Sequence, residues 1–264
     1  MFGRVEQVEH LSPHMIRVVL GGDGLADFTP SPWTDSYVNA YFLPPGATYT
    51  VPFDVDATRA LPVAQRPRSR RYTVRHWDPE RRQLSIDFVV HGDTGVAGPW
   101  AEAARPGDVL QINRPAGSYA PDPDADWHLM IGDESALPAI AASLTHVPTG
   151  KPVYVVAEVD GPADELSLVS PGDLHVSWLH RDANPGTNDL ALQALDKLDR
   201  LPGRVQAFVH GEAVVNRALR KHLLVDWKLP REALSVSPYW RRTFTDESWR
   251  VIKRDWLHEV EQDA

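Results

Sequence analysis

The stretch WHLMIGDESALPAIAASL, residues 127–144, decides the fold of the second half of this chain. Residues 127–131 form a short apolar run that ends at Gly132, as is typical of a buried β-strand. Residues 135–144 follow as an alanine- and leucine-rich segment that favours an α-helix. A strand followed directly by a helix is the repeating unit of a parallel sheet that is covered by helices.

The same alternation continues along the chain and predicts an α/β domain over residues 123–264 that ends in a C-terminal helix. This order implies a mostly parallel sheet with helices on both faces. Ligands of such sheets bind at the carboxyl ends of the strands. Further strands are expected at residues 152–159, 175–179, 205–209 and 234–238, and further helices at residues 189–198, 212–224 and 246–260.

Residues 1–122 have a different character, with short β-rich runs separated by turn residues. Several short strands of this kind predict a small antiparallel β-barrel. The segment Pro121-Asp122-Pro123-Asp124 marks the change between the domains, and residues 50–68 are expected to form an exposed loop. Strands are expected at residues 5–8, 15–20, 37–43 and 109–113, and a hairpin of residues 71–77 with residues 84–90.

The composition fits two ordinary globular domains and excludes several classes of site. Hydrophobic residues make up 42% and charged residues 24% of the 264 residues. The chain has no Cys, which rules out disulfides, zinc–thiolate sites and iron–sulfur clusters, so redox chemistry would belong to a bound cofactor. The net charge of −9 argues against nucleic acid as a partner. Without a long apolar run or a hydrophobic signal core, the chain is expected to be a cytoplasmic protein with no membrane span, and we expect a monomer.

Arginine is concentrated in one part of this acidic chain. Of the 27 basic residues only five are Lys, and eight Arg lie between Arg59 and Arg82. Because the guanidinium group suits phosphate and carboxylate, such a concentration indicates a pocket for an anion. A solvated basic face explains it equally well.

The segment RRYTVR, residues 70–75, carries groups that a flavin requires. On a strand, Arg70 and Tyr72 would share one face and Thr73 would lie on the other. A flavin needs a flat aromatic side chain against its ring, a polar group near N5 and a cation for its phosphates. An ordinary strand with a basic exposed face is the alternative.

Two glycine-containing junctions lead into expected helices. The first, HGDTGVAGPWA at residues 91–101, would offer backbone N–H groups to phosphate at a helix N-terminus, or would be a simple connection. The second, IGDESALP at residues 131–138, lies where a dinucleotide would dock. Because Asp133 and Glu134 have the wrong charge for phosphate, backbone N–H groups and Ser135 would have to bind it. A helix N-cap explains the acidic residues as well.

Other motif searches are negative. The chain contains no G-x-G-x-x-G fingerprint, G-x-S-x-G elbow, P-loop or H-E-x-x-H motif. The His residues are scattered without metal-ligand spacing, so no metal site is expected.

Taken in order, the motifs resemble those of the siderophore-interacting proteins, the flavin-dependent ferric-siderophore reductases of the ferredoxin–NADP reductase superfamily. The resemblance extends from about residue 3 to about residue 255. The ordered set is specific although each motif is modest alone. It consists of R-x-Y-T at residues 70–73, H-G…G-x-x-G-P-W at 91–100, P-G-D at 106–108, G-D-E-S-A-L-P-A at 132–139, H-G-E-A at 210–213 and Y-W-R-R at 239–242.

The resemblance implies FAD bound by the N-terminal barrel and NADH or NADPH bound by the α/β domain. It assigns Arg70 to the FAD pyrophosphate, Tyr72 to the isoalloxazine ring and Thr73 to a hydrogen bond near N5, so Tyr72 and Thr73 are the catalytic candidates. Two positions depart from the family pattern, Asn39 in place of a Lys and Pro238 in place of a Gly. The remaining cofactor-binding candidates are His91, Thr94, Gly95, Val96, Ala97, Gly98, Gly132, Asp133, Glu134, Ser135, Ala136, Glu158, Glu212 and Trp240.

The implied reaction passes electrons from NAD(P)H through FAD to Fe(III) held by a siderophore, so that Fe(II) is released. Glu158, at the end of the second α/β strand, would suit ribose hydroxyls and repel a 2′-phosphate, which favours NADH, and a ferredoxin is an alternative donor. Arg241, Arg242 and Lys253 are candidates to attract an anionic ferric siderophore, with ordinary surface cations as the alternative.

Two other functions stay open. The first is a general NAD(P)H flavin or ferric reductase, or an electron-transfer flavoprotein, without a siderophore substrate. The second is a non-catalytic binding protein on the same fold, against which the intact set of Arg70, Tyr72 and Thr73 argues.

Overall fold

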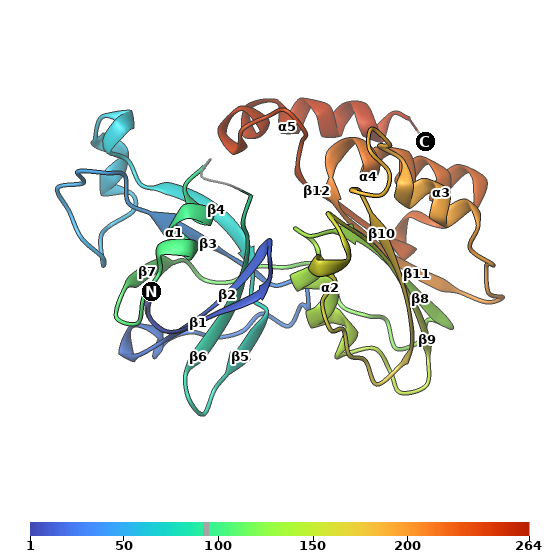
Figure 1. Ribbon diagram of the computed structural model, residues 1–264, viewed down its shortest axis with the longest axis horizontal. Coiled ribbons are helices and arrows are strands. Elements are labelled where there is room, and N and C mark those ends of the chain that lie inside the picture. Colours follow the sequence, from blue (N-terminus) through green and yellow to red (C-terminus); the bar gives the residue numbers. More distant parts are fainter. Residues whose placement is uncertain (92–94, 264) are drawn as a thin grey trace. The chain divides into compact units, whose positions relative to one another are not determined.

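The computed structural model describes residues 1–91 and 95–263, which divide into two compact units, Met1–Ala120 and Pro121–Ala264. The first unit is a seven-stranded sheet with the strand order β4-β3-β7-β1-β2-β6-β5 (Figure 1). Its strand pairs are antiparallel. The elements are β1 Phe2–Ser12, β2 Met15–Gly21, β3 Tyr37–Phe42, β4 Arg68–Thr73, β5 His76–Asp78, β6 Gln83–Val89, α1 Ala97–Ala103 and β7 Val109–Ile112.

The core of this unit follows from alternation along the strands. Val18 and Leu20 of β2 point to the same side as Ile86 and Phe88 of β6, and all four are fully buried. Most of the alternate residues stay partly exposed, as the period of two in a strand predicts, and Asp87 is buried in an ion pair with Arg17. The antiparallel β-domain expected from the sequence is confirmed.

The expected hairpin needs a correction, because residues 71–77 do not form one strand. β4 ends at Thr73 and pairs with β3, whereas β5 pairs with β6. Between them, the N–H of Val74 donates to the carbonyl of Ser36 and the N–H of Arg75 donates to that of Ser85. The chain therefore crosses from the β3 side of the sheet to β6, and these two hydrogen bonds curl the sheet toward a barrel.

The second unit is a five-stranded parallel sheet with the order β10-β9-β8-β11-β12 (Figure 1). From the first strand, β8, the chain adds β9 and β10 on one side and β11 and β12 on the other. The order therefore reverses between β8 and β11, where ligands of such sheets bind. The elements are β8 Trp127–Asp133, α2 Leu137–Leu144, β9 Pro152–Val159, β10 Asp173–His180, α3 Leu190–Asp196, β11 Val205–Glu212, α4 Ala213–Lys221, β12 Leu234–Trp240 and α5 Asp246–Glu261.

Helices cover both faces of this sheet, as the sequence predicts. Leu129 and Ile131 of β8 pack in one cluster with Leu195 of α3 and Leu219 of α4. The opposite face of β8 carries Gly132, where an added Cβ would lie 2.5 Å from Cβ of Ala136 and 3.1 Å from Cδ1 of Ile140. Only glycine lets α2 pack this closely on the strand.

The longest helix, α5, has 16 residues. Among the helices of residues 1–91 and 95–263, none combines the length and the apolar character that crossing a membrane requires. Residues 50–68 contain only the short turns Ala57–Ala60 and Val63–Gln65 before β4, in agreement with the expected loop.

Candidate functional site

Strand β4 holds the three side chains that the sequence assigns to a flavin. Arg70 and Tyr72 are partly exposed, whereas Thr73 is buried. The Tyr72 ring lies 4.3 Å from the Phe88 ring at 43°, so the core supports it on one side. In the described sheet β4 is an end strand whose only partner is β3. The strand therefore presents Arg70 and Tyr72 at an edge of the sheet.

Four of the eight arginines between Arg59 and Arg82 form ion pairs with carboxylates. Ion pairs of this kind leave fewer guanidinium groups for an anionic ligand. The pairs, with N–O distances of 3.1–3.9 Å, are Arg59–Asp56, Arg75–Asp87, Arg81–Asp78 and Arg82–Asp23.

The first glycine-containing junction runs from β6 into α1. His91 is exposed, and Thr94 lies outside the described residues. Gly95 has φ of +90°, and a Cβ there would have no atom within 4 Å. Beyond Gly95, Val96 precedes α1 and packs on the core, and Ala97 is buried. The backbone at Gly95 therefore borders open space, whereas the next two side chains are structural.

At the reversal of strand order, Asp133 is the centre of a hydrogen-bond network. Its Oδ1 accepts from the N–H and the hydroxyl of Ser135 at 2.9 and 2.5 Å. Its Oδ2 accepts from the N–H of Glu212 at 2.9 Å and from the indole Nε1–H of Trp240 at 2.8 Å. Burial raises the pKa of Asp133, and the bonds from Ser135 and Trp240 act in the opposite direction.

These bonds change what the second junction can offer to a ligand. Both polar groups of Ser135 that were expected to meet phosphate already donate to Asp133. Glu212 caps α4 by accepting from the N–H groups of Val214 and Val215, and it also accepts from the N–H of Arg242. Asp133 and Glu212 therefore link the segments that follow β8, β11 and β12.

Glu158 lies beside Asp133 in the parallel register and is buried. Arg181, directly after β10, contacts it at 3.6 Å and binds both carboxylate oxygens of Glu134. Burial raises the pKa of Glu158, and the charge of Arg181 opposes that shift. The sequence analysis missed Arg181, although its position at the end of an expected strand was a usable signal.

His210 is the second residue whose role the sequence analysis missed. It is buried, its Nδ1 lies 3.0 Å from the Tyr239 hydroxyl, and its Nε2 lies 3.0 Å from the Ser235 hydroxyl. Its ring stacks on Phe208 with centroids 3.7 Å apart. Burial and the nearby Lys253 charge lower the pKa of His210 to about 3, so the ring is neutral and ties β11 to β12.

The three expected substrate cations each have a described partner. Arg241 lies over the Phe244 ring at 4.8 Å, and the Arg242 guanidinium donates to the side chain of Asn188. The Lys253 ammonium donates to the carbonyl of Pro238 at 2.5 Å. The structure thus gives Lys253 a role in fixing α5 to β12.

The two departures from the family pattern have local explanations. Pro238 lies in β12, an end strand, where a missing N–H is tolerated. Asn39 lies in β3, opposite Arg71, and its N–H donates to the Asn113 side chain at 2.6 Å. Neither position breaks the sheet that contains it.

A curled antiparallel sheet followed by a five-stranded parallel sheet with a reversed strand order defines a two-domain protein of the ferredoxin–NADP reductase type. Residues 4–119 match the siderophore-interacting FAD-binding domain, and residues 125–243 match the siderophore-interacting protein family. The chain therefore belongs to the siderophore-interacting protein family, as the ordered motifs predict.

Three similar proteins illustrate this relationship. Ferric vibriobactin reductase ViuB of Vibrio cholerae is 34% identical over 247 residues, which cover 91% of this chain and 89% of that protein. The NADPH-dependent ferric-chelate reductase of Escherichia coli is 34% identical over 181 residues, or 67% of this chain and 70% of that protein. The crystal structure of a siderophore utilization protein from T. fusca, at 34% identity, has a TM-score of 0.79 and covers 93% of this chain and 94% of that one.

The residues of the first unit fit FAD. A ring supported by Phe88 on one side and partly exposed is suited to lie against a flat cofactor, and Tyr72 is such a ring. Arg70 supplies a cation on the same strand face, and the open backbone at Gly95 allows close approach.

Proposed function

We propose that this protein is a flavin-dependent ferric-siderophore reductase, with residues 1–122 as the FAD-binding domain and residues 123–264 as the NAD(P)H-binding domain. The observation that carries the proposal is the match of the FAD-binding domain over residues 4–119, which contains Arg70, Tyr72 and Thr73 on one strand. The resemblance to ViuB over most of the chain supports a siderophore complex as substrate.

In this proposal each residue of β4 has a distinct task. Arg70 binds the FAD diphosphate, Tyr72 orients the isoalloxazine ring and Thr73 donates a hydrogen bond near N5. When bound, FAD supplies the conversion between a two-electron donor, NAD(P)H, and a one-electron acceptor, Fe(III). His91 and residues 95–98 would complete the flavin site, and Thr94, outside the described residues, is a further candidate.

The second unit would bind the nicotinamide nucleotide at the reversal of strand order. Gly132, Asp133, Glu134, Ser135 and Ala136 line this edge, together with Glu158, Glu212 and Trp240. Because Ser135 and Asp133 bond to each other, we assign them to shaping the loop and leave phosphate binding to backbone groups. A ferredoxin is the alternative donor.

The substrate would be a ferric complex with oxygen ligands, which hold Fe(III) much more tightly than Fe(II), so reduction releases the metal. Arg241 and Arg242 would attract the anionic complex, and Lys253 would contribute charge from its place beside Pro238. We further propose that the protein works as a cytoplasmic monomer.

The test is a reduction assay on the purified full chain loaded with FAD. The visible flavin absorption should bleach under anaerobic NADH or NADPH and return on addition of a ferric siderophore, with Fe(II) captured by a ferrous-specific chelator. Faster turnover with ferric siderophores than with ferric citrate or free flavin supports the proposal. Equal turnover with all acceptors would point to a general reductase, and a protein that never takes up FAD would point to a binding protein.

A further inference from the structure

Three side chains of β4 share one face of the strand, because alternate residues of a strand point to the same side. They are Arg68, Arg70 and Tyr72. Their partners across the antiparallel register are buried core residues of β3, namely Phe42, Ala40 and Val38. The face that carries Arg70 and Tyr72 of the proposed flavin site therefore continues to Arg68.

The exposure of the side chains increases along this strand. Thr73, at the end of β4, is buried, Tyr72 and Arg70 are partly exposed, and Arg68 is exposed. A bound flavin has a similar requirement, because its reactive ring must be shielded from water whereas its adenosine end can remain in solvent. The strand therefore favours an FAD whose ring lies at Tyr72 and whose adenosine end points toward Arg68.

The spacing of the three side chains matches the order of the groups in FAD. Side chains two residues apart on a strand are separated by about 7 Å, and long side chains can converge from that distance. FAD carries its ring, its ribityl chain, the flavin-side phosphate and the adenylate phosphate in that order. With Tyr72 at the ring and Arg70 at the diphosphate, Arg68 is the next side chain, on the adenylate side.

The Arg68 guanidinium is available for such a contact. Within residues 1–91 and 95–263, it takes part in no ion pair and no side-chain hydrogen bond. Its neighbour Arg71, on the opposite face, lies over the Tyr37 ring at 5.4 Å. Because a guanidinium has five N–H donors in a geometry that suits phosphate, Arg68 can bind a phosphate group without first breaking another described contact.

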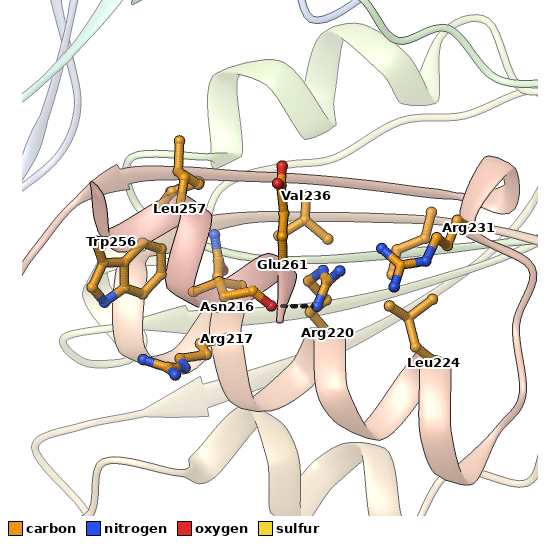
Figure 2. Close-up of a pocket in the computed structure, with 12 residues that line it drawn as sticks. Asn216, Arg217, Arg220, Leu224, Arg231, Val236, Trp256, Leu257 and Glu261 are labelled. Carbon is orange, nitrogen blue, oxygen red and sulfur yellow. Dashed lines mark hydrogen bonds between the residues drawn. The ribbon is translucent and has the colours of Figure 1, made fainter. Parts of the chain in front are cut away.

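The second unit provides a contrasting arginine in a pocket of 480 Å³ (Figure 2). Arg220 lines this pocket and donates from Nη1 to the carbonyl of Val260 at 2.9 Å. The negative charges of Asp263 and Glu261 also stabilise its charged form. The chain itself thus supplies partners for Arg220, whereas Arg68 has none among the described residues.

From this arrangement we infer that Arg68 binds the adenylate phosphate of FAD and gives the site a preference for FAD over FMN, which lacks that phosphate. The inference rests on FAD binding by the first unit, as in the proposed function, and does not depend on the identity of the iron substrate.

The test is a titration of the flavin-free full chain with FAD, FMN and riboflavin, followed by the quenching of flavin fluorescence. In R68Q the dissociation constant of FAD should rise about tenfold, or about 1.4 kcal/mol, and those of FMN and riboflavin should change by less than about twofold. In R70Q both FAD and FMN should bind more weakly, because both carry the flavin-side phosphate. R68K keeps the charge but loses the bidentate geometry, so it should recover part of the FAD affinity.

R71Q is the matched control, because it removes the same charge from an exposed residue on the opposite face of the same strand. Its FAD affinity should stay within about twofold of that of the wild type. An equal loss of FAD and FMN affinity in R68Q, or the same loss of FAD affinity in R71Q, would mean that these arginines act through overall charge and would overturn the inference. Unchanged FAD affinity in R68Q would also overturn it and leave the proposed reductase intact, whereas a wild-type chain that binds no flavin would overturn both.

Discussion

The two candidate sites use polar side chains in opposite ways. On β4, Arg70 and Tyr72 are partly exposed at an end strand. At the reversal of strand order in the second unit, Asp133, Glu134 and Glu212 are each at most 8% exposed and bond to neighbouring loops. The first candidate site leaves its side chains accessible to a ligand, whereas the second uses them to connect its own loops.

This difference separates two kinds of mutational effect. Replacing a side chain that only meets a ligand lowers affinity and leaves the free energy of unfolding nearly unchanged. Replacing a buried carboxylate that several N–H groups depend on lowers stability directly, because those donors stay buried without an acceptor. Measurements of stability and of ligand affinity should therefore respond differently in the two units.

The largest effect is expected for Asp133→Ala. The substitution removes the acceptor of four hydrogen bonds, two of them from Glu212 and Trp240 on other elements. Each buried group left without a partner costs about 1–3 kcal/mol, and water partly replaces the lost bonds. We therefore expect the free energy of unfolding to fall by about 2–4 kcal/mol. Urea unfolding measures it.

Asp160→Asn is the control for this substitution. Asp160 follows β9 in the same acidic region, but its side chain is 55% exposed. Its replacement should change the free energy of unfolding by less than about 0.5 kcal/mol. A similar small change in Asp133→Ala would mean that the network does not stabilise the second unit.

The next effect is a pH dependence that arises from His210. Its folded pKa of about 3 lies below the ordinary value of 6.5, so the unfolded chain binds the proton more readily. Stability from this group is complete above pH 6.5 and is lost as the pH falls toward 3. Between pH 6.5 and 5 the loss should be about 1.6 kcal/mol, because the slope reaches 1.36 kcal/mol per pH unit only well below pH 6.5.

Denaturation curves at several pH values test this point, with His210→Asn as the comparison. Asn can still hydrogen-bond to Tyr239 or Ser235 but does not titrate in this range. The variant should be less stable at pH 7, and its acid-side slope should be flatter. An unchanged slope would assign the acid sensitivity to other groups.

In the first unit, we expect substitutions to lower flavin affinity more than they lower the free energy of unfolding, although the Tyr72 ring also packs on Phe88. Tyr72→Ala removes a ring that we expect to lie against the cofactor, at a cost of about 0.5–1.5 kcal/mol beyond the lost area. Arg70→Ala should weaken FAD binding by about tenfold through the diphosphate. The control is Arg71→Ala, since Arg71 is exposed and lies over the Tyr37 ring. Full FAD occupancy in both site variants would place the flavin elsewhere.

The elements that the sequence predicts well are those set by local patterns. The apolar run and helix of residues 127–144 appear as β8 and α2, because periodicity and packing agree there. The break between β4 and β5 was not predictable. It depends on the hydrogen bond from Val74 to Ser36, a residue distant in sequence.

The same distinction holds for the sites. The sequence alone was enough to place the side chains of residues 70–73 together, because they are consecutive residues of one strand. The partners of Asp133 and Glu134 could not, because Trp240 and Arg181 reach them from strands that only the folded sheet brings close. Sequence patterns therefore predicted positions for the second candidate site, but not which of their polar groups bond to other parts of the chain.

The smallest expected effect is on the choice between NADH and NADPH. Measuring it tests whether the second candidate site distinguishes the two nucleotides through charge. Three carboxylates, those of Glu134, Glu158 and Asp160, surround the Arg181 cation, and Arg242 adds a second positive charge near Glu158. Three negative charges against two positive ones leave the cluster negative, which disfavours a 2′-phosphate. Glu158→Gln removes one negative charge and keeps the side-chain shape. We expect kcat/KM for NADPH to rise about fivefold relative to NADH, or about 1 kcal/mol.

Glu165→Gln is the matched control, because Glu165 binds His180 at 2.8 Å and is not among the described ion-pair partners of Arg181. The ratio of kcat/KM values, measured with one artificial acceptor, cancels effects on flavin content and on the ferric substrate. The expected change should shrink at high salt, since it arises from charge. If the ratio stays constant in Glu158→Gln, the acidic cluster acts only as structural support. The second unit would then use its charged side chains for structure alone, in contrast to the first.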